Sequence, residues 1–151
     1  MEFLGGVQSP PEVWRSLCMV TGAWAIEGAS FFSVIEKSTG KWVGRLGPWH
    51  PHQWPGTEIG WGLTREATGK GYATEGAAAC MDYAADVPKW DTIIHSISTE
   101  NVASIKVAER LGSHFMRRAK APAPFIGHEW DLNGQTAVDW RKNRARIVKR
   151  A

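Results

Sequence analysis

The feature that most constrains the fold is a turn, Gly69-Lys70-Gly71, between a strand pattern at Thr57 to Thr64 and an alanine-rich helix pattern at Gly71 to Ala85. The N–H groups of a glycine turn and of a helix N-terminus point at one spot, which attracts an anion. Gly60 and Gly62 make the preceding strand unusual, since glycine in a strand marks a bulge or a close approach by another backbone or a ligand. The turn is not a Walker loop or a dinucleotide fingerprint. On spacing alone, an anion site and a plain structural turn are equally supported.

The rest of the chain predicts helices and strands in mixed order, which indicates an α+β (mixed α/β) fold with one central, mostly antiparallel sheet flanked by helices. The length of 151 residues fits a single domain over 1–151. The other predicted elements are a helix beginning at Ser9-Pro10-Pro11-Glu12, a hairpin of Phe31–Glu36 and Lys41–Trp49, a strand at Thr92–Ser98, a helix at Val102–Leu111, strands at Ser113–Ala119 and His128–Leu132, and a basic amphipathic helix over 134–151.

Composition excludes several classes of protein. The hydrophobic fraction of 43% and charged fraction of 22% are those of a soluble globular protein. No apolar run approaches the roughly 20 residues of a bilayer span, and no export signal is recognisable, so we expect a cytoplasmic protein. The two cysteines, Cys18 and Cys80, lack CxxC spacing, and the histidines lack zinc-site spacing on a helix; we therefore expect neither a disulfide nor a metal.

Charge is unevenly distributed along the chain. The whole chain carries +3, while residues 134–151 contain six basic residues and only Asp139 as an acid, so the remainder is mildly acidic. A basic tail on an acidic body makes a nucleic-acid partner unlikely, and a solvated helix face is the simpler interpretation of the tail.

Three blocks, in this order, resemble the GNAT acetyltransferases, and in particular the ribosomal-protein alanine N-acetyltransferases of the RimJ/RimL type. They are Glu58-Ile59-Gly60-Trp61-Gly62-Leu63-Thr64, Thr68-Gly69-Lys70-Gly71-Tyr72-Ala73-Thr74-Glu75 and Asn101-Val102-Ala103-Ser104-Ile105-Lys106-Val107-Ala108-Glu109-Arg110-Leu111-Gly112. The likeness extends from about Phe3 to Leu132. It implies the GNAT fold and direct transfer of an acetyl group from acetyl-CoA, as cosubstrate, to a primary amine, either a peptide N-terminus or a small amine.

The resemblance also implies a cofactor site. The backbone from Gly69 to Thr74 would bind the coenzyme A pyrophosphate, Trp61 to Leu63 would pair with the pantetheine arm like an added strand, and Asn101 would contact the same arm. The alternative for Asn101, less favoured, is a helix cap. The expected site residues are Trp61, Gly62, Leu63, Thr64, Thr68, Gly69, Lys70, Gly71, Tyr72, Ala73, Thr74, Asn101 and Ser104.

Two residues are candidates for proton transfer. Ser104 stands where RimL-like enzymes have a serine thought to protonate the leaving thiolate, although a serine in a helix is often only solvated or bonded to the backbone. The tyrosine that many relatives carry in this helix is replaced by Ala108. Glu58 stands where several GNAT enzymes place a general base acting through water; a surface carboxylate is the simpler interpretation. His95 is an alternative base that we do not favour, because a lone histidine in an apolar strand is usually packed or hydrogen-bonded.

Relatives begin with a strand and a helix that this chain lacks, a difference of about 30 residues against the family. An uncovered sheet edge invites pairing, so we expect a homodimer, with the stripe of Trp140, Ile147 and Val148 on the terminal helix packing against the partner. Trp49 and Trp54 could form an aromatic acceptor wall, although burial without function is the simpler interpretation of each. A non-catalytic acyl-CoA-binding or interaction module derived from the GNAT fold is the alternative function.

Overall fold

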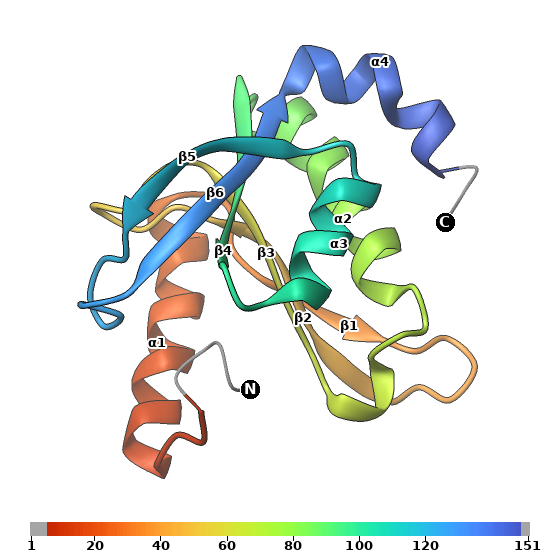
Figure 1. Ribbon diagram of the computed structural model, residues 1–151. Helices are drawn as coiled ribbons and strands as arrows, with labels where there is room; N and C mark the ends of the chain where they lie inside the picture. Colours follow the sequence, from red (N-terminus) through yellow and green to blue (C-terminus); the bar gives the residue numbers. More distant parts are fainter. Residues whose placement is uncertain (1–5, 149–151) are drawn as a thin grey trace.

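The computed structural model describes residues 6–148 (Figure 1). It confirms the mixed α+β fold and places the sheet between helices. The elements are α1 (Pro10–Ile26), β1 (Phe32–Ile35), β2 (Trp42–Trp49), β3 (Glu58–Leu63), α2 (Tyr72–Asp86), β4 (Thr92–Ser98), α3 (Val102–Arg110), β5 (His114–Lys120), β6 (Glu129–Thr136) and α4 (Ala137–Val148), with a 3₁₀ turn at Arg65–Ala67 before α2. The first residues of the family resemblance, Phe3 to Gly5, lie outside the described residues.

The six strands form one sheet in the order β1-β2-β3-β4-β6-β5. Every neighbouring pair is antiparallel except β3 and β4, which run parallel. Within residues 6–148, β1 and β5 are therefore the edge strands. The last strand is longer than the sequence predicted, because β6 continues from Leu132 to Thr136 and stays paired with β4 throughout.

The main core lies between the sheet and helices α2, α3 and α4. Alanines let α2 approach the sheet closely, and Gly76 is required there because a Cβ would lie 2.3 Å from Leu46 Cδ2. This cluster contains Leu46, Ile59, Ala77, Ala78, Cys80, Met81, Ala84, Ile93, Val107, Leu111, Trp140 and Ile147. A second, smaller cluster contains Ile94, Ala121, Trp130 and Leu132, with Trp54 packed against it. The smaller cluster occupies the opposite face of the sheet, because Ile93 and Ile94 are consecutive in β4.

Helix α4 corrects two expectations. Residues 134–136 belong to β6, so the helix begins at Ala137, where Thr136 Oγ1 accepts a hydrogen bond from the Asp139 N–H at 3.1 Å. The apolar stripe does not face a partner: Trp140 and Ile147 are buried in the core of their own chain because they pack into the cluster that contains α2. The side chain of Val148 and residues 149–151 lie outside the described residues.

Helix α1 forms as predicted (Figure 1). Ser9 and Glu12 make the capping box that starts it. None of its side chains is buried, and the large apolar residues Val13, Trp14 and Leu17 are exposed. Within the described part of the chain, no helix, α1 included, combines the length and apolarity needed to cross a membrane.

Candidate active site

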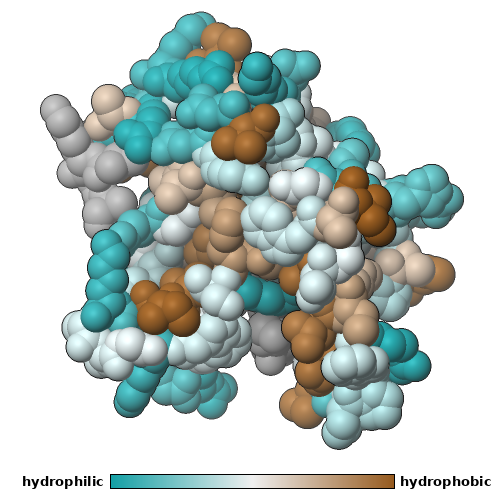
Figure 2. Space-filling model, turned by 180° about the vertical axis from the view of Figure 1, so that it is seen from behind, coloured by the Kyte–Doolittle hydropathy of each residue, from teal (hydrophilic) through white to brown (hydrophobic). Residues whose placement is uncertain are grey.

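The site is organised by the divergence of β3 and β4. The two strands are paired only where Glu58 lies beside Ile94, with the Ile94 N–H donating to the Thr57 carbonyl at 2.9 Å. Beyond that pair they separate toward their C-terminal ends (Figure 1). The space-filling view shows a hollow in the lower half of the molecule, lined by both hydrophobic and hydrophilic residues (Figure 2).

Backbone groups of β3 line the gap between the diverging strands. The carbonyls of Thr57 and Ile59 face β4, because they accept hydrogen bonds from Ile94 N–H and from His95 Nδ1. Since residues two apart in a strand direct their N–H and C=O groups to the same side, those of Trp61 and Leu63 also face the gap. The backbone of Gly62, by contrast, faces β2. The arrangement leaves donors and acceptors that an extended, amide-containing ligand could pair with.

The loop after β3 ends in a cradle of backbone N–H groups. Gly69 and Gly71 have φ of +81° and +86°, a conformation that glycine adopts without strain, and a Cβ on either would meet no atom within 4 Å. Gly71 caps α2 without a side-chain hydrogen bond, so the first N–H groups of the helix, from Tyr72 to Thr74, are available to an anion. The Thr68 hydroxyl donates to the Thr64 carbonyl at 3.2 Å and closes the turn.

A carboxylate that sequence reasoning missed lies beside this cradle. Glu36, at the end of β1, accepts a hydrogen bond from the Tyr72 hydroxyl, and its Oε1 lies 3.9 Å from Lys70 Nζ. Hydrogen bonds from Thr39 and Tyr72 lower the pKa of Glu36. Lys70 and Glu36 therefore form an ion pair in this structure. Nothing in the local sequence around Glu36 indicated this contact.

The start of α3 brings Asn101 and Ser104 together. Asn101 is a helix cap, since its Oδ1 accepts the Ser104 N–H at 3.1 Å. The Ser104 hydroxyl is not bonded to the helix backbone; its Oγ accepts a hydrogen bond from Trp61 Nε1 at 3.2 Å. A hydroxyl that accepts this bond keeps its own proton to donate elsewhere.

Glu58 corrects the expectation of a surface carboxylate. It is 8% exposed, and burial raises its pKa to about 7. Trp54 Nε1 donates to Glu58 Oε2 at 2.7 Å. Burial outweighs the bond from Trp54 and the nearby Ser96, both of which favour the ionised carboxylate and lower its pKa. Ser96 acts by its proximity, because its hydroxyl makes no hydrogen bond of ordinary geometry. A carboxylate with a pKa near 7 suits proton abstraction near neutral pH.

His95 does not serve as the alternative base. Its ring is buried, with Nδ1 2.7 Å from the Ile59 carbonyl and Nε2 3.1 Å from Ser113 Oγ. Burial lowers the pKa of His95 to about 4, which leaves the ring neutral near pH 7. Nδ1 therefore donates to β3 and Nε2 accepts from Ser113, the residue before β5, so both ring nitrogens are engaged.

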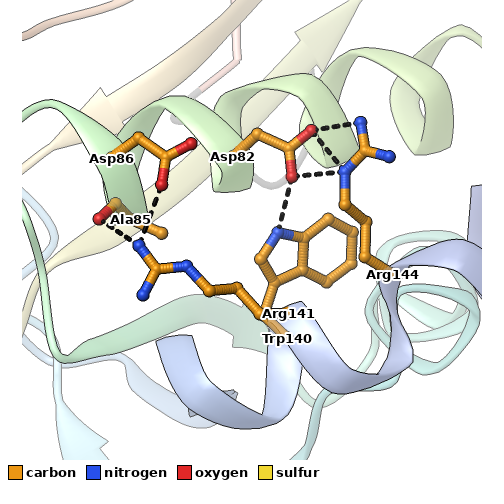
Figure 3. Close-up of a pocket in the computed structure, with 6 residues that line it drawn as sticks. All are labelled: Asp82, Ala85, Asp86, Trp140, Arg141 and Arg144. Carbon is orange, nitrogen blue, oxygen red and sulfur yellow. Dashed lines mark hydrogen bonds and ion pairs between the residues drawn. The ribbon is translucent and has the colours of Figure 1, made fainter.

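A depression of about 320 Å³ between α2 and α4 is a packing feature (Figure 3). Asp82 accepts hydrogen bonds from Trp140 Nε1 at 3.0 Å and Arg144 Nε at 2.6 Å. Arg141 donates to the Ala85 carbonyl and to Asp86. These polar groups satisfy one another and attach α4 to α2, so we assign no ligand to the depression.

Comparisons with known proteins agree with this geometry. A family model described as "Acetyltransferase (GNAT) domain" matches residues 1–114. The uncharacterized protein YkkB of Bacillus subtilis (strain 168) is 35% identical over 92 residues, which cover 60% of this chain and 54% of YkkB; the chain thus spans about half the length of that curated relative.

Two solved structures are similar over most of the chain. An acetyltransferase from Agrobacterium tumefaciens str. C58 is 28% identical, with a TM-score of 0.77 over 89% of this chain and 76% of that one. RimJ of Mycobacterium smegmatis, in complex with CoA-disulfide, is 21% identical, with a TM-score of 0.71 over 97% of this chain and 73% of that one. The latter likeness is one of fold.

Proposed function

Because the chain belongs to the GNAT acetyltransferase family, we propose that it transfers the acetyl group of acetyl-CoA directly to a primary amine. The observation that carries the proposal is the divergence of β3 from β4, which leaves backbone groups of β3 beyond Glu58 unpaired with β4, together with the N–H cradle at Gly69 to Thr74. A thioester arm pairing along β3 would leave its pyrophosphate at the N-terminus of α2, where the helix dipole favours negative charge. The open space beside Gly69 and Gly71 fits such a group.

In our proposal, the two proton transfers involve side chains on opposite faces of the sheet. Glu58 and Trp61 are three residues apart in β3, so their side chains project from opposite faces, and Trp61 holds Ser104 on its own face. In our proposal the amine nitrogen attacks the thioester carbon, a new C–N bond forms, and the C–S bond breaks. Glu58 accepts the amine proton, directly or through water, and the Ser104 hydroxyl donates a proton to the departing sulfur, to be replaced from solvent.

The acceptor belongs to the same proposal. As acceptor we favour an unhindered primary amine, either a peptide N-terminus or a small-molecule amine. The block Asn101–Gly112 supports a RimJ/RimL-like enzyme. The free cysteines, Cys18 and Cys80, support a reducing, cytoplasmic setting. A homodimer remains our proposal, now through the edge strand β1 in place of α4.

A screen of acetyl transfer tests the function. The purified chain would be incubated with acetyl-CoA and panels of peptides with free N-termini, polyamines and small amines, and free thiol release would be measured, with intact-mass analysis to detect self-acetylation. We expect turnover on at least one class and loss of turnover in Glu58→Gln. Coenzyme A binding by calorimetry without turnover on any class would favour the alternative, a non-catalytic acyl-CoA-binding module.

A further inference from the structure

The two oxygens of the Glu58 carboxylate have different surroundings. Oε2 accepts the indole N–H of Trp54 at 2.7 Å. Trp54 lies in the loop between β2 and β3, half-buried, with its ring 6.3 Å from that of Trp49 and 5.4 Å from that of Trp130. This packing holds the indole in place, and through it the carboxylate, because a hydrogen bond to a charged group is stronger than one between neutral groups.

Oε1 lies beside a position where the chain has no side chain. A Cβ on Gly60 would lie 3.1 Å from Glu58 Oε1 and 3.3 Å from Phe31 Cε1. Both contacts are tighter than ordinary van der Waals separation. The φ of Gly60 lies outside the left-handed region, so the missing side chain matters for space and not for backbone conformation. The space that a Cβ would need is thus taken by the Glu58 carboxylate and by the Phe31 ring, which stacks on Trp49 with centroids 5.1 Å apart.

We propose that Trp54 and Gly60 are positioning residues for Glu58: Trp54 holds Oε2 through its hydrogen bond, and Gly60 leaves the room beside Phe31 that Oε1 occupies. The inference rests on the proposed function, since it names the residues that hold the base to which the acceptor's proton passes. It gives Gly60 a role separate from cofactor binding, because its side-chain direction is that of Glu58 and opposite to that of Trp61.

The surroundings of Glu58 make the role of Trp54 measurable. The titratable and charged groups on the neighbouring elements are Arg45 on β2, His50 and His52 on the loop, and His95 on β4, whose ring is on the other face. None of them contributes to the raised pKa of Glu58, which burial dominates. Among the described neighbours, the donors that favour the carboxylate are Trp54 and Ser96, so removing the indole N–H raises the pKa further.

The test uses three variants of the full chain. Trp54→Phe keeps an aromatic ring and removes the donor, and Gly60→Ala places a methyl group against Oε1 and Phe31. Trp90→Phe is the matched control, at a half-buried tryptophan that packs against the main core. The pH dependence of kcat/KM is measured with saturating acetyl-CoA. We expect Trp54→Phe to shift the acidic limb of the kcat/KM profile to higher pH. The loss in kcat/KM should be about tenfold or more at pH 6.5 and smaller at pH 9. We expect Gly60→Ala to lower kcat/KM for the amine at every pH while coenzyme A affinity is unchanged, and Trp90→Phe to change neither.

Two further measurements keep the proposal falsifiable. In a Glu58→Gln background, Trp54→Phe should cause no additional loss, since its effect passes through the carboxylate. If the wild-type chain turns over no amine, the proposed function fails; the Glu58 pKa is then read by carboxyl ¹³C NMR, with Glu58→Gln identifying the signal. A Glu58 pKa or acid limb that Trp54→Phe leaves unmoved, or full amine activity in a folded Gly60→Ala, would overturn the proposal.

Discussion

Replacing Glu58 with glutamine should stabilise the protein above neutral pH while it abolishes activity. The carboxylate is buried, and its pKa rises from 4.5 to about 7. Between those values the folded state binds more protons than the unfolded state, so stability falls as pH rises through the window, and the full cost is present above pH 7. Glutamine retains an oxygen that can accept the Trp54 N–H and carries no charge.

The magnitude follows from the size of the shift. A change of one unit corresponds to 1.36 kcal/mol, so the ionised Glu58 costs about 3 kcal/mol at pH 8 and about 1 kcal/mol at pH 5. We therefore expect the advantage of Glu58→Gln in the free energy of unfolding to grow by about 2 kcal/mol between these two pH values.

Urea denaturation of both proteins at pH 5 and pH 8 measures the difference. His95 also titrates with a lowered pKa, so it contributes stability that is lost as pH falls from its unfolded pKa of 6.5 toward about 4. That contribution is present in both proteins and cancels when they are compared. A difference between the two proteins that is the same at pH 5 and pH 8 would refute the reasoning, because it would show that Glu58 does not ionise at a cost.

Three more expectations follow from the same structure. Gly71→Val should raise the dissociation constant of coenzyme A at least tenfold by calorimetry, because a branched side chain would fill the N–H cradle; Gly127→Val, at another glycine with positive φ and open space, should carry similar backbone strain without that loss. Ser104→Ala should lower kcat roughly 10- to 100-fold with little change in KM, and an unchanged kcat would leave Ser104 with a structural role. Trp140→Ala should lower the free energy of unfolding by about 4 kcal/mol, since the indole is fully buried and bonded to Asp82; a loss under 1 kcal/mol in urea melts would contradict the packing of α4 on α2.

The sequence alone determined the elements and the cradle, because both depend on local chemistry. Capping residues at Ser9, the alanine run after Gly71 and the turn at Gly40 act over a few neighbouring residues, so their helices and hairpin were predicted within a few positions. The glycine turn at Gly69 to Gly71 likewise predicted unpaired backbone N–H groups at the start of a helix. The end of β6 and the start of α4 were placed wrongly, since the pairing of β6 with β4 overrides the local pattern.

Only the tertiary structure decided the state of each candidate side chain. Glu58 has the same local sequence whether it faces solvent or lies beneath Trp54, and burial by distant residues is what raises its pKa. The bond from Trp61 to Ser104 joins residues 43 positions apart, and α4 packs on α2 through contacts of similar range. Proton chemistry depends on desolvation and on partners brought together by folding, and local periodicity carries no record of either.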